Sequence, residues 1–256
     1  MKIKITKVLI HIVSYVDSVA QILDWACNHE SRSVYAANVH MLMEAYDHPD
    51  FRKIVNSADL VTPDGMPLVW VLRKKGFPRQ QRVYGPTLML EVLQKAAQEN
   101  IAVGFLGDTE AVLQKLSEKM LEKFPGLHIA VKLSPPFTPL SVEEDKVLCS
   151  QVNAAGVRIL FVALGCPKQE RWIAAHLGKI DAVMIGVGAA FAFHAGVVRQ
   201  APAWMQKIGL EWLYRFSQEP GRLWKRYLVN NPRFAILVTL ELLRERLHSL
   251  RGEGRN

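Results

Sequence analysis

Short apolar runs and longer amphipathic segments alternate along the first 195 residues of the chain. The short runs predict strands, whereas the longer segments carry apolar residues at helical spacing. The expected strands are Ile5–Val13, Val34–Ala37, Asp59–Val61, Ile101–Leu106, His128–Leu133, Arg158–Leu164 and Ala182–Val187. The expected helices are Ser18–Asn28, one or two within Val39–Asn56, Gly65–Arg73, Pro86–Glu99, Glu110–Phe124, Val142–Ala155 and Lys168–Leu177. Such alternation predicts βαβ units, and hence an α/β, Rossmann-like fold whose mainly parallel sheet has helices on both faces.

The pattern changes after His194, where strand-like runs end and aromatic and basic residues interleave. Trp204, Ile208, Trp212 and Phe216 recur at helical spacing and predict one apolar stripe along a helix. We therefore expect an α/β core over residues 1–195 and a C-terminal basic, aromatic-rich helical appendage over residues 196–256. The same pattern also fits core helices with solvated basic faces.

The net charge of +8 is concentrated in this appendage, which has eleven Lys and Arg residues against five Glu. A basic, Trp-rich, amphipathic segment is typical of attachment to an anionic membrane surface. No run reaches the roughly 20 apolar residues that cross a bilayer. The apolar patch Val8–Val13 is too short for a secretory signal. Cys27, Cys149 and Cys166 form no CxxC pair, which argues against a disulfide framework or zinc site and fits a reducing cytoplasm.

Two polar residues follow neighbouring predicted strands at the point where each strand ends. Asn38 follows Val34–Ala37, and Asp64 closely follows Asp59–Val61. Ligands of open parallel sheets bind at the carboxyl ends of the strands, so we expect both side chains to share a crevice. A carboxylate there can take a proton from an attacking hydroxyl. The alternative is that Asp64 caps the helix that begins near Met66, and the two roles can coexist.

Glycine-containing turns join other predicted strands to helices. The segment Gly165–Glu170 offers free backbone N–H groups suited to phosphate, with Lys168 adding charge and Gln169 a hydrogen bond to a sugar or base. It also fits an ordinary strand-to-helix turn. The turn around Gly188 allows a ligand close to the backbone, but it lacks the third glycine and the acidic partner of a dinucleotide fingerprint. Near Gly107, the following Asp108 or Thr109 is expected to cap the next helix.

Several motifs are missing from the chain. No GxxxxGK[ST] segment is present, which excludes a P-loop nucleotidase, and no GxSxG elbow is present, which weakens a hydrolase interpretation. No DxD pair or His/Cys cluster calls for a bound metal. His40, His176 and His194 are isolated in the sequence and are interpreted as packed or capping residues.

A linked set of motifs runs along nearly the whole chain and resembles the WecG/TagA/CpsF family of glycosyltransferases in spacing and order. The segments are Ala37-Asn38-Val39-His40, Thr62-Pro63-Asp64-Gly65-Met66-Pro67, Arg82-Val83-Tyr84-Gly85-Pro86, Gly104-Phe105-Leu106-Gly107, Leu164-Gly165-Cys166-Pro167-Lys168-Gln169-Glu170, Gly186-Val187-Gly188-Ala189, Arg199-Gln200-Ala201-Pro202 and Gly209-Leu210-Glu211-Trp212 with Arg215, Pro220, Arg222 and Arg226.

This resemblance implies an inverting, metal-independent transfer of a sugar from a UDP-sugar to a polyprenyl-diphosphate-linked saccharide, without a cofactor. It assigns the base to Asp64. It assigns substrate binding to Asn38, Arg82, Gly107, Lys168, Gln169, Gly188, Arg215, Arg222 and Arg226. Arginines suit the charge that develops on a leaving diphosphate. The lipid-linked acceptor implies a cytoplasmic enzyme attached peripherally to the inner face of the plasma membrane.

One departure from the family pattern affects the donor. Ala36 stands where the family's T-x-N motif has threonine, which favours a neutral hexose used in exopolysaccharide synthesis. Two other classes of function are alternatives: a nicotinamide-dependent Rossmann oxidoreductase, and a nucleic-acid-binding protein acting through the basic tail. The missing fingerprint argues against the first, and the continuous apolar stripe against the second. The oligomeric state and the transferred sugar stay open.

Overall fold

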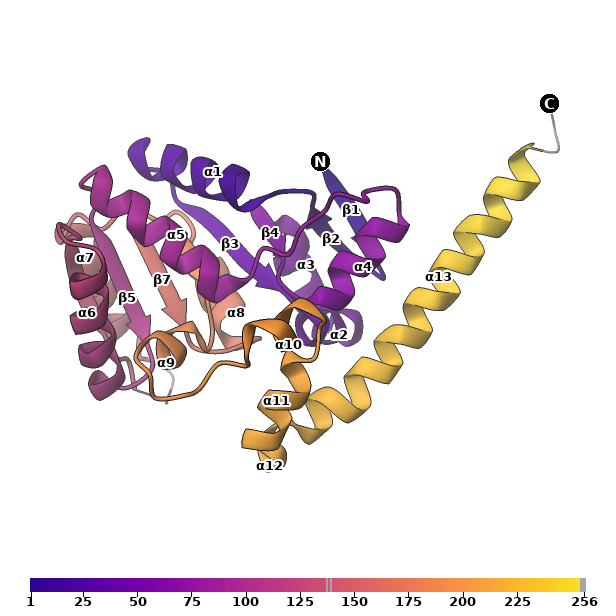
Figure 1. Ribbon diagram of the computed structural model, residues 1–256. Helices are drawn as coiled ribbons and strands as arrows, with labels where there is room; N and C mark the ends of the chain where they lie inside the picture. The colour runs from indigo at the N-terminus through magenta and orange to yellow at the C-terminus, as the bar shows by residue number, and fades with distance from the viewer. Residues whose placement is uncertain (137, 139, 254–256) are drawn as a thin grey trace.

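The computed structural model describes residues 1–136, 138 and 140–253. Its centre is a six-stranded parallel sheet with the strand order β4-β3-β8-β7-β5-β6 (Figure 1). The strands are β3 (Arg32–Ala37), β4 (Leu60–Pro63), β5 (Val103–Gly107), β6 (Ile129–Leu133), β7 (Ile159–Ala163) and β8 (Val183–Gly186). The predicted parallel α/β architecture is confirmed.

Helices cover both faces of the sheet. They are α1 (Tyr15–Cys27), α2 (Val39–Asp47), α3 (Pro49–Ser57), α4 (Met66–Lys74), α5 (Gly85–Gln98), α6 (Glu110–Lys123), α7 (Val142–Ala154), α8 (Lys168–His176) and α9 (Ala190–His194). One apolar core packs the sheet against α1, α5, α6 and α9, and a second packs it against α2, α3, α7 and α8. Alternate residues of β7 enter the two cores, as a strand buried on both faces requires: Phe161 the first, Leu160 and Val162 the second.

The N-terminal segment differs from its prediction as a single strand. β1 (Lys2–Ile5) and β2 (Val8–His11) form an antiparallel hairpin that is separate from the main sheet. Thr6 has a φ of 57°, and this left-handed conformation turns the chain within two residues. The hairpin buries Ile5, Val8 and Ile10 in the core shared with α2 and α3. The apolar pattern alone therefore indicated extended chain but missed the turn.

The C-terminal segment is helical, as predicted, but not as one continuous helix. It comprises α10 (Ala203–Lys207), α11 (Glu211–Gln218), α12 (Pro220–Trp224), a π-helical turn over Lys225–Val229, and α13 (Asn230–Glu253). The expected stripe from Trp204 to Phe216 is wrong as a single face, because Gly209 separates α10 from α11 with a φ of 76°.

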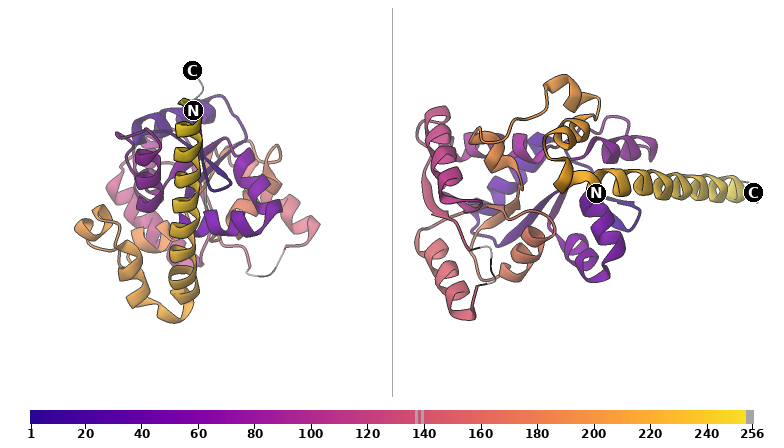
Figure 2. Two further views of the ribbon diagram at one scale, coloured as in Figure 1. Left: turned by 90° about the vertical axis from the view of Figure 1, so that its right-hand side faces the viewer. Right: turned by 90° about the horizontal axis from the view of Figure 1, so that it is seen from below.

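The final helix turns back along the core and then extends beyond it, as Figures 1 and 2 show. Phe234 and Val238 bury its first turns against α2, and Arg233 forms an ion pair with Asp47. Further along, Lys75 of the core contacts Glu241 at 2.8 Å. No helix within the described part of the chain is long and apolar enough to cross a membrane.

Candidate active site

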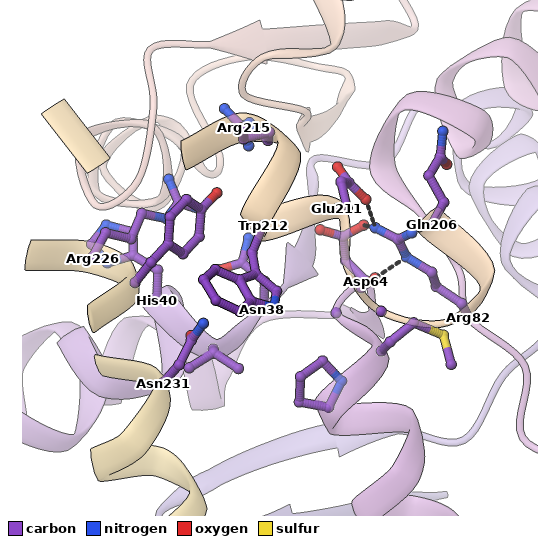
Figure 3. Close-up of a pocket in the computed structure, with 16 residues that line it drawn as sticks. Asn38, His40, Asp64, Arg82, Gln206, Glu211, Trp212, Arg215, Arg226 and Asn231 are labelled. Atoms are coloured by element: carbon purple, nitrogen blue, oxygen red, sulfur yellow. Dashed lines mark hydrogen bonds and ion pairs between the residues drawn. The ribbon is translucent and has the colours of Figure 1, made fainter. Parts of the chain in front are cut away.

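A pocket opens where β3 and β4 end, and the C-terminal segment forms its other wall (Figure 3). In the parallel register Ala37 lies beside Pro63, so the residues that follow, Asn38 and Asp64, are neighbours. Both line the pocket, as the sequence predicted. Asn38 also caps α2 by accepting a hydrogen bond from the Met41 N–H at 3.2 Å.

Asp64 does not cap the following helix, so that alternative is wrong. The cap position belongs to Gly65, which makes no side-chain cap bond. Instead, Asp64 Oδ1 accepts the backbone N–H of Gly85 at 3.0 Å and lies 3.8 Å from Arg82 Nη2. Burial raises the pKa of Asp64 to about 6, and Glu211 adds to the rise, while Arg82 opposes it. A carboxylate with this pKa is ionised at neutral pH and more basic than an ordinary aspartate, which suits a general base.

A network around Arg82 joins the core to the C-terminal segment. Arg82 Nη2 donates to Glu211 Oε2 at 2.6 Å, and its Nε donates to the backbone carbonyl of Asp64. Tyr84 donates from its hydroxyl to Glu211 Oε1 at 2.7 Å, and its ring centroid lies 3.8 Å from the Arg82 guanidinium. The sequence singled out Arg82 but missed Glu211 and Tyr84, although both occur in quoted motifs, because no local spacing connects them.

The three predicted tail arginines occupy different environments. Arg215 and Arg226 line the pocket, whereas Arg222 lies outside it with 65% of its side chain exposed and an ion pair to Glu219. Arg226 Nε is buried without a hydrogen-bond partner. Burial and the nearby Arg215 cation lower the pKa of Arg226. Two guanidinium groups that line one pocket, one of them with a buried Nε that lacks a partner, favour an anionic ligand.

His40 also belongs to the pocket, although from its sequence position it was interpreted as a packed or capping residue. Its Nδ1 is buried without a hydrogen-bond partner. Burial, followed by the Arg226 cation, lowers the pKa of His40 to about 4, so the ring is neutral near pH 7. Figure 3 shows Trp212 between His40 and Arg226 on one side and Asp64 with Arg82 on the other. The pocket therefore has a cationic lobe and a lobe that holds the candidate base.

The remaining predicted residues lie at the ends of β5, β7 and β8 and do not line this pocket. Gln169 is buried, and its Oε1 accepts the Gly188 N–H at 3.1 Å. Gly107 has a φ of 115°, and a Cβ there would lie 2.6 Å from the Ala163 carbonyl oxygen. Lys168 begins α8 with an exposed side chain. These residues follow the same edge of the sheet as Asp64 but not the same cavity.

Among the residues that the structure describes, a group of side chains of the kinds that bind metal ions lies away from this pocket. Asp145, Cys149 and His176 bring their ligand atoms within 4.8 Å of one another. His176 Nε2 lies 2.8 Å from Asp145 Oδ1, and Nδ1 lies 2.6 Å from the Trp172 carbonyl oxygen. Both ring nitrogens of His176 therefore contact oxygen atoms of the protein. The contact links α7 to the end of α8, away from the pocket.

Comparison with known proteins gives the family. The profile of the glycosyl transferase WecG/TagA/CpsF family matches residues 3–248. The chain is also 32% identical, over 196 residues, to the N-acetylglucosaminyldiphosphoundecaprenol N-acetyl-beta-D-mannosaminyltransferase of Bacillus spizizenii. That match covers 76% of this chain and 74% of the relative. The chain therefore belongs to the WecG/TagA/CpsF family of glycosyl transferases.

Proposed function

We propose that the protein transfers a hexose-type sugar from a UDP-sugar to a polyprenyl-diphosphate-linked saccharide. Family membership supports glycosyl transfer. The name of the Bacillus spizizenii relative supports the acceptor class, because that enzyme acts on N-acetylglucosamine linked to undecaprenyl diphosphate. We extend to this chain an acceptor of the same kind.

The observation that carries the proposal is the joining of a buried, basic carboxylate and arginines in one pocket. Asp64 would take the proton from the acceptor hydroxyl as its oxygen attacks the anomeric carbon of the donor sugar. The bond to the diphosphate breaks on the opposite face of the sugar, so the configuration inverts. Arg215 and Arg226 would stabilise the charge that collects on the departing UDP. Arg82 donates to the backbone carbonyl of Asp64, and its Nη2 lies 3.8 Å from the Asp64 carboxylate.

The same arrangement supports transfer without a metal ion. Divalent cations in glycosyl and phosphoryl sites are bound by groups of oxygen ligands, usually carboxylates. In this pocket the carboxylates of Asp64 and Glu211 both face Arg82. Both carboxylates are therefore paired with a guanidinium. The tail arginines would supply the positive charge at the diphosphate that a metal ion would otherwise supply.

The C-terminal appendage, residues 196–256, would bring the pocket to the inner face of the plasma membrane. Its outer surface exposes large apolar side chains, among them Trp204 at 60% and Trp224 at 52%. Exposed indoles beside basic residues are suited to an interface with anionic lipid. Trp212 instead lines the pocket. The appendage thus supplies both membrane contact and part of the active site.

The donor sugar would be selected near Ala36. This residue is the second-last of β3, and a Cβ placed on Gly85 would lie 3.2 Å from the Ala36 Cβ. Gly85 in turn donates its N–H to Asp64. Because alanine replaces the threonine of the family motif at this position, the chain lacks that threonine's hydroxyl close to Asp64. We retain a neutral hexose as the expected donor, to be tested against N-acetylmannosamine, the sugar in the relative's name.

The oxidoreductase and nucleic-acid alternatives gain no support. The Gly188 N–H, which a dinucleotide fingerprint would offer to pyrophosphate, donates to Gln169. A Cβ on Gly186 would also lie 3.0 Å from Gln169 Nε2, so a side chain already fills this turn. Of the basic residues of the tail, Arg215 and Arg226 line the pocket and not the outer surface that a nucleic acid would contact.

The test is a panel of UDP-sugars offered with a polyprenyl-diphosphate-linked N-acetylglucosamine, with products identified by mass spectrometry. We expect one UDP-sugar to give a product extended by a single residue, and Asp64→Asn to lower turnover by about 10²-fold or more. Asp181→Asn makes the same change at the amino end of β8, away from the pocket, and should retain activity. Near-normal turnover of a folded Asp64→Asn variant would refute the assignment of the base.

A further inference from the structure

Glu211 connects the C-terminal segment to the pocket of the core. It begins α11, and its two carboxylate oxygens accept hydrogen bonds from Arg82 Nη2 at 2.6 Å and from the Tyr84 hydroxyl at 2.7 Å. The Glu211 and Arg82 side chains are 14% and 16% exposed. A charge-assisted pair with so little solvent contact is strong and specific in its geometry.

Asp64 and Glu211 face the same guanidinium at different distances. Arg82 Nη2 lies 2.6 Å from Glu211 Oε2 but 3.8 Å from Asp64 Oδ1. The Asp64 carboxylate is instead held by the Gly85 N–H at 3.0 Å. Arg82 is thus engaged mainly by the tail carboxylate, and the contacts of Asp64 with Gly85 and Arg82 both fall on its Oδ1.

We propose that Glu211 is a positioning residue for glycosyl transfer: it holds the Arg82 guanidinium away from the Asp64 carboxylate and thereby preserves the basicity of Asp64. This inference rests on the proposed function, in which Asp64 is the base. It gives the docked tail a role in proton transfer that is separate from binding of the diphosphate or the membrane.

The charges around Asp64 set the direction of the effect. Besides Arg82 and Glu211, the Gly85 N–H and the Asn38 side chain hydrogen-bond to the Asp64 carboxylate. Tyr15 from α1, Tyr84 before α5 and Arg226 from the π-helical turn are electrostatically coupled to it. Glu211 carries the negative charge that opposes the effect of the Arg82 cation on the pKa of Asp64. An unopposed cation within 4 to 6 Å lowers a carboxyl pKa by about 1 to 3 units. Loss of the Glu211 charge should therefore make Asp64 a weaker base.

The experiment uses Glu211→Gln, which keeps the shape of the side chain and removes its charge. We expect the pKa of Asp64 to fall by about 1 unit or more. The acid limb of the kcat/KM profile should move to lower pH by the same amount, and turnover above the limb should drop. The carboxyl titration is followed directly by infrared spectroscopy of protein labelled at aspartate, with Asp64→Asn to assign the band. This second readout needs no turnover, so it separates failure of the inference from failure of the proposed function.

The matched control is Glu245→Gln. Glu245 is also a tail carboxylate paired with a core cation, Lys75, but it lies on α13 outside the pocket. It should leave the Asp64 titration and the acid limb in place. Adding Arg82→Gln to Glu211→Gln removes the unopposed cation and should return the Asp64 titration toward the wild-type position.

The inference is overturned if Glu211→Gln lowers activity equally at every pH while Asp64 titrates as in the wild type, because Glu211 would then only dock the tail. Should Glu211→Gln not fold, Tyr84→Phe loosens the same carboxylate without removing a charge. A smaller shift of the Asp64 titration in the same direction would support the inference, and an unchanged titration would overturn it.

Discussion

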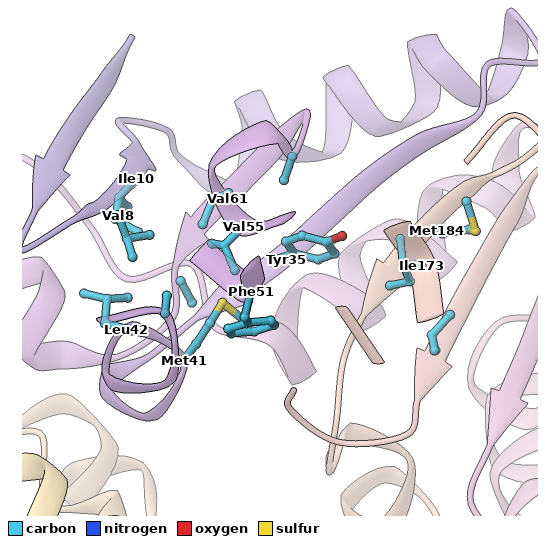
Figure 4. Close-up of a cluster of buried hydrophobic side chains, with 14 of the residues drawn as sticks. Val8, Ile10, Tyr35, Met41, Leu42, Phe51, Val55, Val61, Ile173 and Met184 are labelled. Carbon is cyan, nitrogen blue, oxygen red and sulfur yellow. The ribbon is translucent and has the colours of Figure 1, made fainter. Parts of the chain in front are cut away.

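Glu170 is a buried carboxylate whose substitution should change the stability of the protein in a pH-dependent way. The residue is 0% exposed, and its Oε1 accepts a hydrogen bond from Gln169 Nε2 at 2.6 Å. Its Oε2 is buried without a hydrogen-bond partner. The Tyr35 hydroxyl donates to the Glu170 backbone carbonyl, and Tyr35 packs with Ile173 and Met184 in the apolar cluster of Figure 4. The carboxylate is thus fully buried, and one of its two oxygens has no hydrogen-bond partner.

The size of the expected change in stability follows from the pKa of Glu170. Burial raises the pKa of Glu170 from 4.5 to about 6, against the opposing bond from Gln169. A rise of roughly 1.5 units corresponds to about 2 kcal/mol between the protonation states. Between pH 4.5 and 6 the folded chain retains a proton that the unfolded chain has lost, so stability falls as pH rises through this window. Above this pH window, the ionised and buried Glu170 destabilises the folded state by the full amount of about 2 kcal/mol.

Glu170→Gln removes this titration while keeping the shape of the side chain. The hydrogen bonds gained or lost by the amide do not depend on pH, so they cancel when two pH values are compared. We expect the free energy of unfolding of the variant, relative to wild type, to rise by about 2 kcal/mol between pH 4.5 and pH 7.5. Guanidinium unfolding at several pH values, with an unchanged m-value, measures this difference.

The control is Glu118→Gln on α6, an exposed glutamate whose substitution reports the general effect of removing one negative charge. A Glu170→Gln difference that is flat across the pH range would refute the argument. It would mean that Glu170 is solvated or paired in solution, and that burial does not set its proton affinity.

Two further predictions concern catalysis and membrane contact. Excess EDTA should leave the initial rate of transfer unchanged within error, because in the proposed mechanism arginines take the place of a metal at the diphosphate, and a loss restored by Mn²⁺ or Mg²⁺ would contradict this. Replacing Trp204 and Trp224 by Ser should weaken binding to anionic vesicles at least about tenfold, since both exposed indoles would leave the lipid interface. The same variant should keep its turnover on a short, water-soluble acceptor analogue, and undiminished vesicle binding would show that other residues make the contact.

Local sequence patterns were sufficient to predict the parallel sheet and two residues of the candidate site, Asn38 and Asp64. A strand buried on both faces appears in the sequence as a short apolar run, and an amphipathic helical segment follows most of these runs, so the βαβ order is visible along the chain. Parallel strands place their carboxyl ends on one edge, which is why Asn38 and Asp64 could be expected together. The helix starts were also local: Thr109 caps α6, as the sequence indicated.

The sequence pattern did not predict the backbone conformation of individual residues. Thr6 and Gly209 each adopt a positive φ that breaks an apolar pattern the sequence carries through without interruption. The pattern records which side chains avoid water, but not where the chain turns between them. The first strand therefore became a hairpin, and the expected tail stripe was divided between an exposed Trp204 and a Trp212 that lines the pocket.

The sequence by itself determined the fold class, the edge of the sheet at which the candidate pocket lies, and Asp64 as the residue to test. Only the tertiary structure decided what surrounds that carboxylate. Glu211 lies 129 residues from Arg82 along the chain, and His40 meets Arg226 from a different element. Such contacts depend on how the C-terminal segment docks across the strand ends. Docking is set by the combined packing of Phe234 and Val238 and by ion pairs between distant segments, and no local period encodes it.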